Sequence, residues 1–336
     1  MAPIVSVIIP TLNRCDCLSS CLESLVAQDF KDFEVLVVDA GSTDGTAELV
    51  NKFSSRLNIK ILSCERGLVK QMNMGFKHAS GDITIRTDDD IVATRRWLSE
   101  VTETFRSDVR IGGVTGPTTV PPEFRAHRDL FYFQNKLTKG GFAWRFLGKI
   151  YYSVFLEGLP LAVSRWFRSG AFSLGSNYEP SLKLQEVLDV DNLEGCNMAV
   201  RRDLFLRVGG FDESFVGIGE YCEPDLTFRI RSCGYRIVFN PRARIYHLPS
   251  KGGFFQERPD SYGRMINFLN FYFRHIRPNT VDKALRFGLY VLFLNLFFLY
   301  KFFETGQQNQ LNAARGTLTG IAKNLSSSGR PTKCDV

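Results

Sequence analysis

Short apolar runs alternate with helical segments along the first hundred residues of the chain. Apolar runs rich in β-branched residues cover residues 4–9, 33–38 and 59–62, and segments typical of helices, residues 15–28 and 46–53, separate them. Continuous apolar strands that alternate with helices are typical of a parallel sheet covered on both faces. We therefore expect an α/β fold with a mostly parallel sheet.

Polar residues follow the first two predicted strands at the points where these strands end. Residues 10–14 follow the first strand, and residues 39–44 follow the second. The carboxyl ends of parallel strands share one edge of a sheet, where ligands bind, so we expect the two segments to lie side by side. Neither segment contains a GxxxxGK phosphate loop or a GxGxxG turn, which disfavours kinases and dinucleotide-dependent dehydrogenases.

Three consecutive aspartates, residues 88–90, follow a further predicted strand at residues 81–87. Adjacent carboxylates repel one another, and a hard divalent cation relieves this repulsion while it leaves coordination positions open for phosphate oxygens. We therefore favour a metal site. The alternative is a solvated acidic turn that caps a helix predicted over residues 93–105.

The net charge of the chain is concentrated near its C-terminal end. The 336 residues contain 42 Lys and Arg against 35 Asp and Glu, a net charge of +7, and residues 264–336 contain ten basic and three acidic residues. The rest of the chain is therefore electrically neutral. The basic segment has too few cations among its aromatic residues for a nucleic-acid-binding surface. We expect an anionic membrane surface as its partner and no nucleic acid.

An apolar run of 14 residues, 287–300, lies within this basic segment. A membrane-spanning helix needs about 20 residues, so a helix that lies in the plane of the membrane or is half-inserted fits better. The alternative is a helix buried against the core or in an oligomer contact. From about residue 307 the chain is polar and contains an SSSG segment, so we expect about the last 25 residues to be mobile.

The cysteines and the N-terminus both indicate a cytosolic chain. The eight cysteines are scattered without paired CxxC spacing, which disfavours a zinc site and a disulfide framework, and we expect reduced thiols. The chain begins Met-Ala-Pro and continues directly into an apolar strand, with no basic segment or cleavage site. We therefore expect no signal peptide.

Several ordered motifs resemble those of glycosyltransferase family 2, inverting enzymes of the GT-A fold. The resemblance covers about residues 4–120 and 190–250. The motifs, weak singly and strong in order, are VSVIIPTLNR (5–14), VLVVDAGSTDGT (35–46), GDITIRTDDD (81–90), EGCNMAVRR (194–202), GGFDESF (209–215), EPDLTFRIRSCGYRI (223–237) and IYH (245–247). The resemblance implies a Rossmann-like, mostly parallel sheet with helices on both faces, in an enzyme that uses a nucleotide-activated sugar.

The resemblance assigns the nucleotide pocket to the first two motifs. It implies that Pro10 and Thr11 line this pocket, that Asp39 accepts a hydrogen bond from the base, and that Ser42 lies near the ribose or base. The alternative for Asp39 is to cap the turn that follows it. Many family members have a second acid after this aspartate, whereas this chain has Ala40.

The resemblance also implies contacts to the donor diphosphate and to a metal. Arg66 and Lys70 lie where the family places basic or polar donor contacts, although Lys70 also fits an ordinary surface charge. Asp88 and Asp89 would bind the donor.

Asp90 would bind Mg²⁺ or Mn²⁺ that bridges the diphosphate. His247 matches a position where a histidine completes the metal site, and an imidazole ligand favours Mn²⁺. Without the family, a single histidine is more often a structural residue.

Inversion at the anomeric carbon needs one base that takes the proton of the acceptor hydroxyl. The family carries this base in an acidic pair before an Asp-Leu at the start of a helix. Alignment on Asp225 puts the base at Glu223, with Cys222 in place of the first acid and Pro224 in the first helical turn. Glu220 is the alternative base, and Asp225 fits better as a residue that caps the helix or braces the loop.

The segment 121–189 mixes cations with aromatic and apolar residues, and the family motifs do not cover it. Such a mixture suits a bilayer interface that faces a lipid-phosphate acceptor, and the alternative is a helical insertion folded onto the sheet. We expect a catalytic domain over residues 1–260 that includes this insertion, and a helical, basic and apolar extension over residues 261–336 that associates with a membrane.

These expectations combine into a metal-dependent inverting glycosyltransferase at the cytosolic side of the cell membrane, held peripherally or monotopically. The donor would be a nucleotide-diphosphate sugar, with a UDP-sugar preferred, and the acceptor a lipid-linked glycan or polyprenyl phosphate. One alternative is the same chemistry on a soluble or protein-bound glycan. Another is a non-catalytic scaffold that binds sugar nucleotides, which the retained Asp triplet and Glu223 disfavour.

Overall fold

The N-terminal part of the chain alternates strands and helices. The computed structural model describes residues 3–121, 135–173, 179–249 and 260–326. Its first elements are β1 (Val5–Thr11), α1 (Cys15–Val26), β2 (Phe33–Asp39), α2 (Thr46–Phe53), β3 (Ile59–Ser63), α3 (Leu68–His78), β4 (Ile83–Arg86), β5 (Ile91–Ala93), α4 (Trp97–Ser107), β6 (Ile111–Thr115) and β7 (Thr118–Thr119).

The later elements are shorter strands followed by long helices. They are α6 (Phe142–Ile150), the π-helix η2 (Tyr151–Phe155), α7 (Glu179–Leu182), β8 (Leu188–Asp189), β9 (Met198–Arg201), α8 (Arg202–Arg207), α9 (Cys222–Ser232), β10 (Arg236–Phe239) and β11 (Ile245–His247). Four helical segments follow, namely α10 (Ser261–Phe271), the π-helix η4 (Tyr272–Ile276), α11 (Val281–Thr305) and α12 (Gln308–Ser326).

An eight-stranded sheet forms the centre of the fold, in the order β3-β2-β1-β4-β9-β6-β10-β8. β1, β2, β3 and β4 are parallel, and β6 and β10 run in the same direction. Only β9 and β8, among the strands of this sheet, are antiparallel to their neighbours. The predicted α/β fold with a mostly parallel sheet is therefore confirmed.

Helices cover both faces of this sheet because the strands are apolar on both faces. Val7 packs in one buried cluster with Leu22 of α1 and with residues of α4. Its neighbour Ile8 points to the opposite face and packs with Met72 of α3 and Leu226 of α9. Adjacent residues of a strand face opposite sides of the sheet, so an uninterrupted apolar strand is buried from both sides.

A small second sheet, in the order β5-β11-β7, lies next to the Asp triplet. The helix predicted over residues 93–105 begins later than expected, because Ile91–Ala93 forms β5 and α4 starts at Trp97. β5 pairs antiparallel with β11, and Ile91 lies opposite His247. This pairing joins segments about 150 residues apart, so the local pattern does not reveal it.

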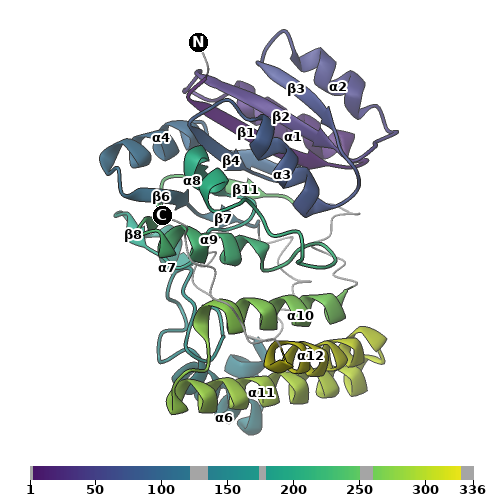
Figure 1. Ribbon diagram of the computed structural model, residues 1–336, viewed down its shortest axis with the longest axis vertical. Helices are drawn as coiled ribbons and strands as arrows, with labels where there is room; N and C mark the ends of the chain where they lie inside the picture. Colours follow the sequence, from purple (N-terminus) through teal and green to yellow (C-terminus); the bar gives the residue numbers. More distant parts are fainter. Residues whose placement is uncertain (1–2, 122–134, 174–178, 250–259, 327–336) are drawn as a thin grey trace.

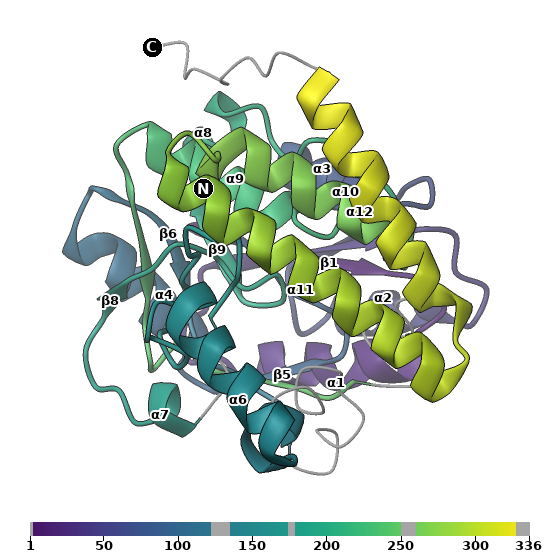
Figure 2. The same cartoon turned by 90° about the horizontal axis from the view of Figure 1, so that it is seen from below.

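The C-terminal helices and part of the insertion form a separate helical layer (Figures 1 and 2). Phe155 of η2 contacts Phe293 of α11 at 5.5 Å between ring centroids, and Tyr272 of η4 stacks on Phe287 at 3.9 Å. These residues belong to a third apolar cluster, distinct from the two on the sheet. The described α6 and η2 therefore pack with the C-terminal extension, and the proposed division at residue 260 stays a prediction.

Two expectations for the C-terminal extension need correction. α11 has 25 residues, so the helix is much longer than its 14-residue apolar run, and by length and composition it could cross a membrane. Residues 308–326 form α12, packed on α10, so the expected mobile end is wrong for these residues. The glycine at position 316 allows α12 to approach α10 closely, since a Cβ there would lie 2.4 Å from the Tyr262 carbonyl oxygen.

Most cysteines behave as predicted. Free thiols are present at Cys15, Cys17, Cys21, Cys64, Cys196 and Cys222. Cys233, which follows α9, is disulfide-bonded. The expectation of reduced thiols is therefore wrong at this position.

Candidate active site

The carboxyl ends of β1 and β2 lie side by side, as the strand pattern predicts. Thr11 is opposite Asp39 in the parallel register of the two strands. The loops beyond them are joined, because the Asn13 amide donates to Ser42 Oγ at 2.8 Å and the Thr43 amide donates to Asn13 Oδ1 at 2.8 Å. These bonds hold the two loops as one edge.

Asp39 caps the turn that follows it in this structure. The Ser42 amide lies 3.1 Å from each carboxylate oxygen of Asp39. Asp39 is half-buried at the end of β2, and Pro10 is buried within β1. The alternative role named for Asp39 is thus present, and its contact to a nucleotide base stays a prediction.

Arg14 holds two members of the Asp triplet. Its Nε lies 2.9 Å from Asp89 Oδ1, and its Nη2 lies 2.6 Å from Asp90 Oδ2. Thr11 Oγ1 donates to the other Asp89 oxygen at 2.8 Å, and Asp89 is 5% exposed. Burial raises the pKa of Asp89 to about 7, although the charge of Arg14 and the hydrogen bond from Thr11 act in the opposite direction. Asp89 therefore joins the triplet to β1 and the loop after it.

His247 lies beside Asp90 because β11 pairs with β5, which begins directly after the triplet. His247 Nε2 is 3.0 Å from Asp90 Oδ1, and both residues are buried. Burial alone would raise the pKa of Asp90, yet the hydrogen bond from His247 and the charges of His247 and Arg14 lower it below its ordinary value. Residues far apart in sequence thus meet at one point.

Three residues at this point could hold a metal ion. Asp88, Asp90 and His247 each offer a ligand atom, and these atoms lie within 4.8 Å of one another. Two carboxylate oxygens and one imidazole nitrogen suit Mn²⁺, and oxygen ligands also suit Mg²⁺. The structure therefore adds Asp88 to the predicted ligands Asp90 and His247.

Arg86 connects this cluster with the predicted base. It is 4% exposed at the end of β4, with Nη2 2.7 Å from Asp88 Oδ1 and Nη1 3.5 Å from Glu223 Oε1. Gly195 packs against the pair, because a Cβ there would lie 2.2 Å from Arg86 Nη1 and 2.9 Å from Glu223 Oε1. The buried guanidinium of Arg86 therefore lies between the carboxylates of Asp88 and Glu223.

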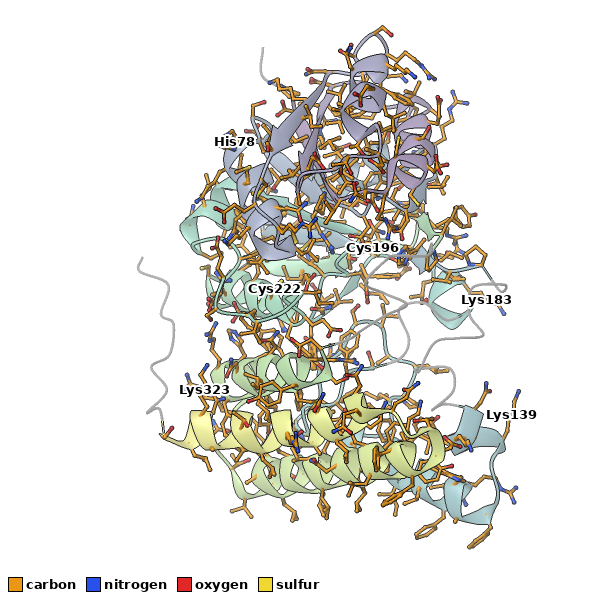
Figure 3. All side chains as sticks on the ribbon, turned by 90° about the vertical axis from the view of Figure 1, so that its right-hand side faces the viewer. His78, Lys139, Lys183, Cys196, Cys222 and Lys323 are labelled. Atoms are coloured by element: carbon orange, nitrogen blue, oxygen red, sulfur yellow. The ribbon has the colours of Figure 1, made fainter. Side chains whose placement is uncertain are left out.

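Glu223 is the second residue of α9, and its side chain is 17% exposed. Its neighbour Cys222 is buried, and burial raises the pKa of this thiol well above its ordinary value, so the thiol stays neutral. The alternative base Glu220 lies 3.5 Å from Arg264 of α10. Figure 3 places Cys222 and Cys196 between the sheet and the helical layer.

Asp225 braces α9 against the helical layer. Its side chain is fully buried and accepts hydrogen bonds from Arg229 Nε at 2.9 Å and Arg274 Nη1 at 2.7 Å, with His275 Nε2 at 2.8 Å. Burial opposes ionisation, but these three partners lower the pKa of Asp225 to about 2. The suggested bracing role fits this geometry.

The two predicted basic donor contacts lie at the surface. Arg66 is exposed in the loop between β3 and α3. Lys70, on the first turn of α3, is exposed and lies 2.7 Å from Glu65 Oε2. The structure does not bring Lys70 to the Asp triplet, and the surface-charge alternative describes its present contact.

Sequence reasoning missed the roles of Arg14 and Arg86. Both lie in quoted motifs, Arg14 four residues after Pro10 and Arg86 two residues before Asp88. The available signal was a charged residue at the end of an apolar strand, because a buried charge needs a partner. The partners come from other elements, so the pattern alone could not name them.

Solved glycosyltransferase structures share this fold. The mannosyltransferase PcManGT from Pyrobaculum calidifontis, in complex with GDP-Man and Mn²⁺, matches 98% of this chain and 89% of its own, with 18% identity and a TM-score of 0.56. S. aureus TarS 1–349 in complex with UDP-GlcNAc matches 97% of this chain and 81% of its own, with 18% identity and a TM-score of 0.58. The fold is therefore the GT-A fold of glycosyltransferases.

The sequence also matches a family model over part of its length. The model of glycosyl transferase family 2 matches residues 6–156, which contain all of β1 except Val5, the Asp triplet and all of the predicted donor residues. Over these residues, which are less than half of the chain, the sequence is similar to glycosyl transferase family 2.

Two curated relatives from Haloferax volcanii carry glycosyltransferase names. The glucosyl-dolichyl phosphate glucuronosyltransferase is 25% identical over 256 residues, which cover 72% of this chain and 68% of the relative. Glycosyltransferase AglE is 36% identical over 108 residues, which cover 31% of this chain and 36% of the relative. The chain thus spans about two thirds of the first relative and about one third of the second.

Proposed function

We propose that this enzyme is a metal-dependent inverting glycosyltransferase that acts at the cytosolic face of a membrane. It transfers a sugar from a nucleotide-diphosphate sugar, preferentially a UDP-sugar, to a hydroxyl or phosphate group of a lipid-linked glycan or polyprenyl phosphate. The observation that carries the proposal is the connected set of a three-residue metal cluster, Arg86 and Glu223.

Asp88, Asp90 and His247 would hold Mn²⁺ or Mg²⁺. The bound ion supplies positive charge that neutralises the leaving diphosphate. Arg14 keeps Asp90 in position through a 2.6 Å contact, and the β5–β11 pairing keeps His247 beside it. The mannosyltransferase structure, obtained with Mn²⁺, supports this choice of ion.

Glu223 would remove the proton from the acceptor hydroxyl. Inverting transfer needs one base on the face of the sugar opposite the leaving group. Arg86 links Glu223 to the metal cluster, whereas Glu220 lies beside Arg264 and Cys222 is a neutral thiol. These contacts support Glu223 over the other candidates.

Thr11, Pro10, Asp39 and Ser42 would form the nucleotide pocket at the joined ends of β1 and β2. In this proposal the Asp39 carboxylate turns from the Ser42 amide to an N–H of the base. Arg66 and Lys70 would approach the diphosphate from the start of α3, which requires Lys70 to leave Glu65.

The acceptor assignment draws on the relative named for glucosyl-dolichyl phosphate and on the apolar helix α11. A second candidate acceptor is a soluble or polymeric glycan. It is favoured by 35% identity over 122 residues to the S. aureus poly(ribitol-phosphate) β-N-acetylglucosaminyltransferase TarS, which cover 21% of that relative.

The test compares the purified full chain with its Glu223→Gln and Glu220→Gln variants. Nucleotide release is measured with UDP- and GDP-sugars, each with Mn²⁺, Mg²⁺ or EDTA, and with a polyprenyl-phosphate-linked glycan or a soluble glycan as acceptor, because both offer a hydroxyl group whose proton Glu223 would remove. We expect metal-dependent transfer to the lipid, and a loss on the order of 100-fold or more for Glu223→Gln because general bases contribute about 10²–10⁴-fold. Glu220→Gln should stay within about threefold of the original rate. Native-rate transfer by a folded Glu223→Gln enzyme would refute the assigned base.

A further inference from the structure

A stripe of exposed apolar side chains runs along α11 on the side that faces away from the sheet. Its members follow one another at alternating spacings of four and three residues. They are Leu285 (62% exposed), Leu289 (44%), Leu292 (56%), Leu296 (58%), Leu299 (38%) and Phe303 (81%). Figure 3 shows side chains that project from α11 and α6 away from the sheet. The spacing keeps these six residues on one face of the helix, so the chain presents a continuous apolar edge.

α6 extends this edge with three more exposed apolar side chains. Phe142 is 80% exposed, Phe146 is 56% exposed and Leu147 is 36% exposed. α6 lies beside the C-terminal part of α11, because Trp144 contacts Tyr300 at 4.9 Å between ring centroids. The two helices thus form one apolar face, which we call the α6–α11 face. Apolar surface gathered in this way marks an interaction site.

Polar contacts tie α11 to the protein at both of its ends. Near the N-terminal end, Asp282 lies 2.8 Å from Arg168. Near the C-terminal end, Glu304 lies 3.2 Å from Lys136. The two ion pairs are about 33 Å apart along the helix, at 1.5 Å per residue, so α11 lies flat on the protein over its length. The apolar stripe can therefore contact a partner only along the length of α11, and not by insertion of one end of the helix.

The charges around the α6–α11 face suit an anionic surface. Lys139, Arg145 and Lys149 are exposed on α6 and on the residues before it, and α6 contains no acidic residue. Figure 3 shows Lys139 at the end of the molecule that carries this face. Anionic lipid headgroups attract such cations, and acyl chains accept the adjacent apolar side chains.

The composition of α11 favours a lipid surface over a second copy of the chain. Between Arg286 and Lys301 the helix has no charged residue. A helix pair with this spacing normally carries charged residues beside its apolar seam, which set the partner and its register. The apolar stripe of α11 has no such flanking charged residues over about four turns. The acyl chains of a lipid bilayer therefore fit this stripe better than a partner helix does.

From these observations we propose that the α6–α11 face docks in the plane of one anionic membrane leaflet, with α11 parallel to the surface and not across the bilayer. This proposal deepens the membrane location in the proposed function, but it does not depend on the transfer chemistry. Its test therefore contains no sugar donor, and a Glu223→Gln protein must bind vesicles like the unchanged protein.

The binding test is flotation of the full chain with phosphatidylcholine vesicles that contain 0 or about 30% phosphatidylglycerol, an anionic lipid. We expect binding that increases with the anionic lipid and a loss of at least tenfold in the partition coefficient for Leu292→Glu/Leu296→Glu. Phe142→Ser/Phe146→Ser should also weaken binding, and Arg145→Glu/Lys149→Glu should abolish the dependence on anionic lipid.

Two control variants change exposed apolar residues outside the α6–α11 face. Val109→Glu and Leu206→Glu replace side chains that are 78% and 44% exposed, and both proteins should bind as before. Equal binding by Leu292→Glu/Leu296→Glu and the unchanged protein would overturn the proposal. The proposal would also be overturned if the protein did not bind vesicles and instead formed a dimer, measured by light scattering, that these two substitutions dissociate.

A labelling experiment separates in-plane docking from a spanning helix. Val281→Cys and Thr305→Cys place thiols at the two ends of α11, and an impermeant maleimide is added outside preformed vesicles. In-plane docking predicts additional labelling at both positions, measured by mass spectrometry against the unchanged protein. Protection of one end only, restored by detergent, would show a spanning helix and refute the in-plane orientation.

Discussion

Replacing Asp225 with Asn should destabilise the protein by about 3 kcal/mol, because loss of one partner of a buried ion pair costs about 3–5 kcal/mol. The Asp225 side chain is fully buried, and its carboxylate meets Arg229, Arg274 and His275 at 2.7 to 2.9 Å. Asparagine keeps the shape but not the charge. Arg274 retains Asp212 at 2.9 Å, which places the expected loss at the lower end of this range.

The pKa of Asp225 gives a second estimate of the same energy. Its folded value is about 2, whereas an unfolded aspartate has a pKa of about 3.9. This difference corresponds to roughly 2–3 kcal/mol of folding free energy at neutral pH. The pKa shift, which arises from the same three contacts, is thus consistent with the expected loss of stability.

The assay is urea unfolding of both proteins at pH 7, followed by circular dichroism, with hydrogen exchange of η4, which contains Arg274 and His275, as a local measurement. Asp203→Asn is the matched control, because Asp203 and Arg207 form an exposed pair at 3.3 Å, and such pairs contribute about 0–1 kcal/mol. We expect faster exchange in η4 only for Asp225→Asn. A loss below about 1 kcal/mol for Asp225→Asn would show that this cluster does not brace α9.

Three further predictions concern the site and its surroundings. Gly195→Ala should lower the transfer rate at least tenfold with little change in melting temperature, because the new methyl group displaces the flexible ends of Arg86 and Glu223; an unchanged rate would contradict this. His247→Ala should raise the Mn²⁺ concentration for half-maximal activity by at least tenfold, measured by metal titration; an unchanged value would exclude His247 as a ligand. The stabilisation by Asp225, fully present above its unfolded pKa of about 3.9, should decrease as pH falls toward its folded value of about 2, so the Asp225→Asn difference in unfolding free energy should shrink from pH 5 to pH 3.

Local sequence pattern predicted the elements whose partners are close in the chain. The helix expected over residues 46–53 forms there, and the strands at residues 4–9 and 33–38 appear with ends shifted by one or two residues. These strands are buried on both faces, so their apolar runs identify them without knowledge of their neighbours. The placement of residues 10–14 beside residues 39–44 followed from the same reasoning, and the register of Thr11 with Asp39 agrees with it.

The expected mobile end shows where the pattern misled. Residues 308–326 are polar enough to suggest a solvated end, yet they form α12. The helix is stable there because Ala313, Gly316 and Gly320 are small and allow close contact with α10. Small residues stabilise a helix only where another helix packs against them, and the local sequence pattern does not show which helix that is.

The α/β fold, the Asp triplet at a strand end and Glu223 as a candidate base could be predicted from the sequence, and the family resemblance also placed His247 with Asp90. The three-dimensional structure was needed to show that Asp88 joins these two residues, that Arg86 lies between Asp88 and Glu223, and that α6 joins α11 in one apolar face. The reason is the distance along the chain between the residues that interact. Apolar periodicity reports how one segment meets the core, whereas ion pairs and shared surfaces depend on which distant segments fold against each other.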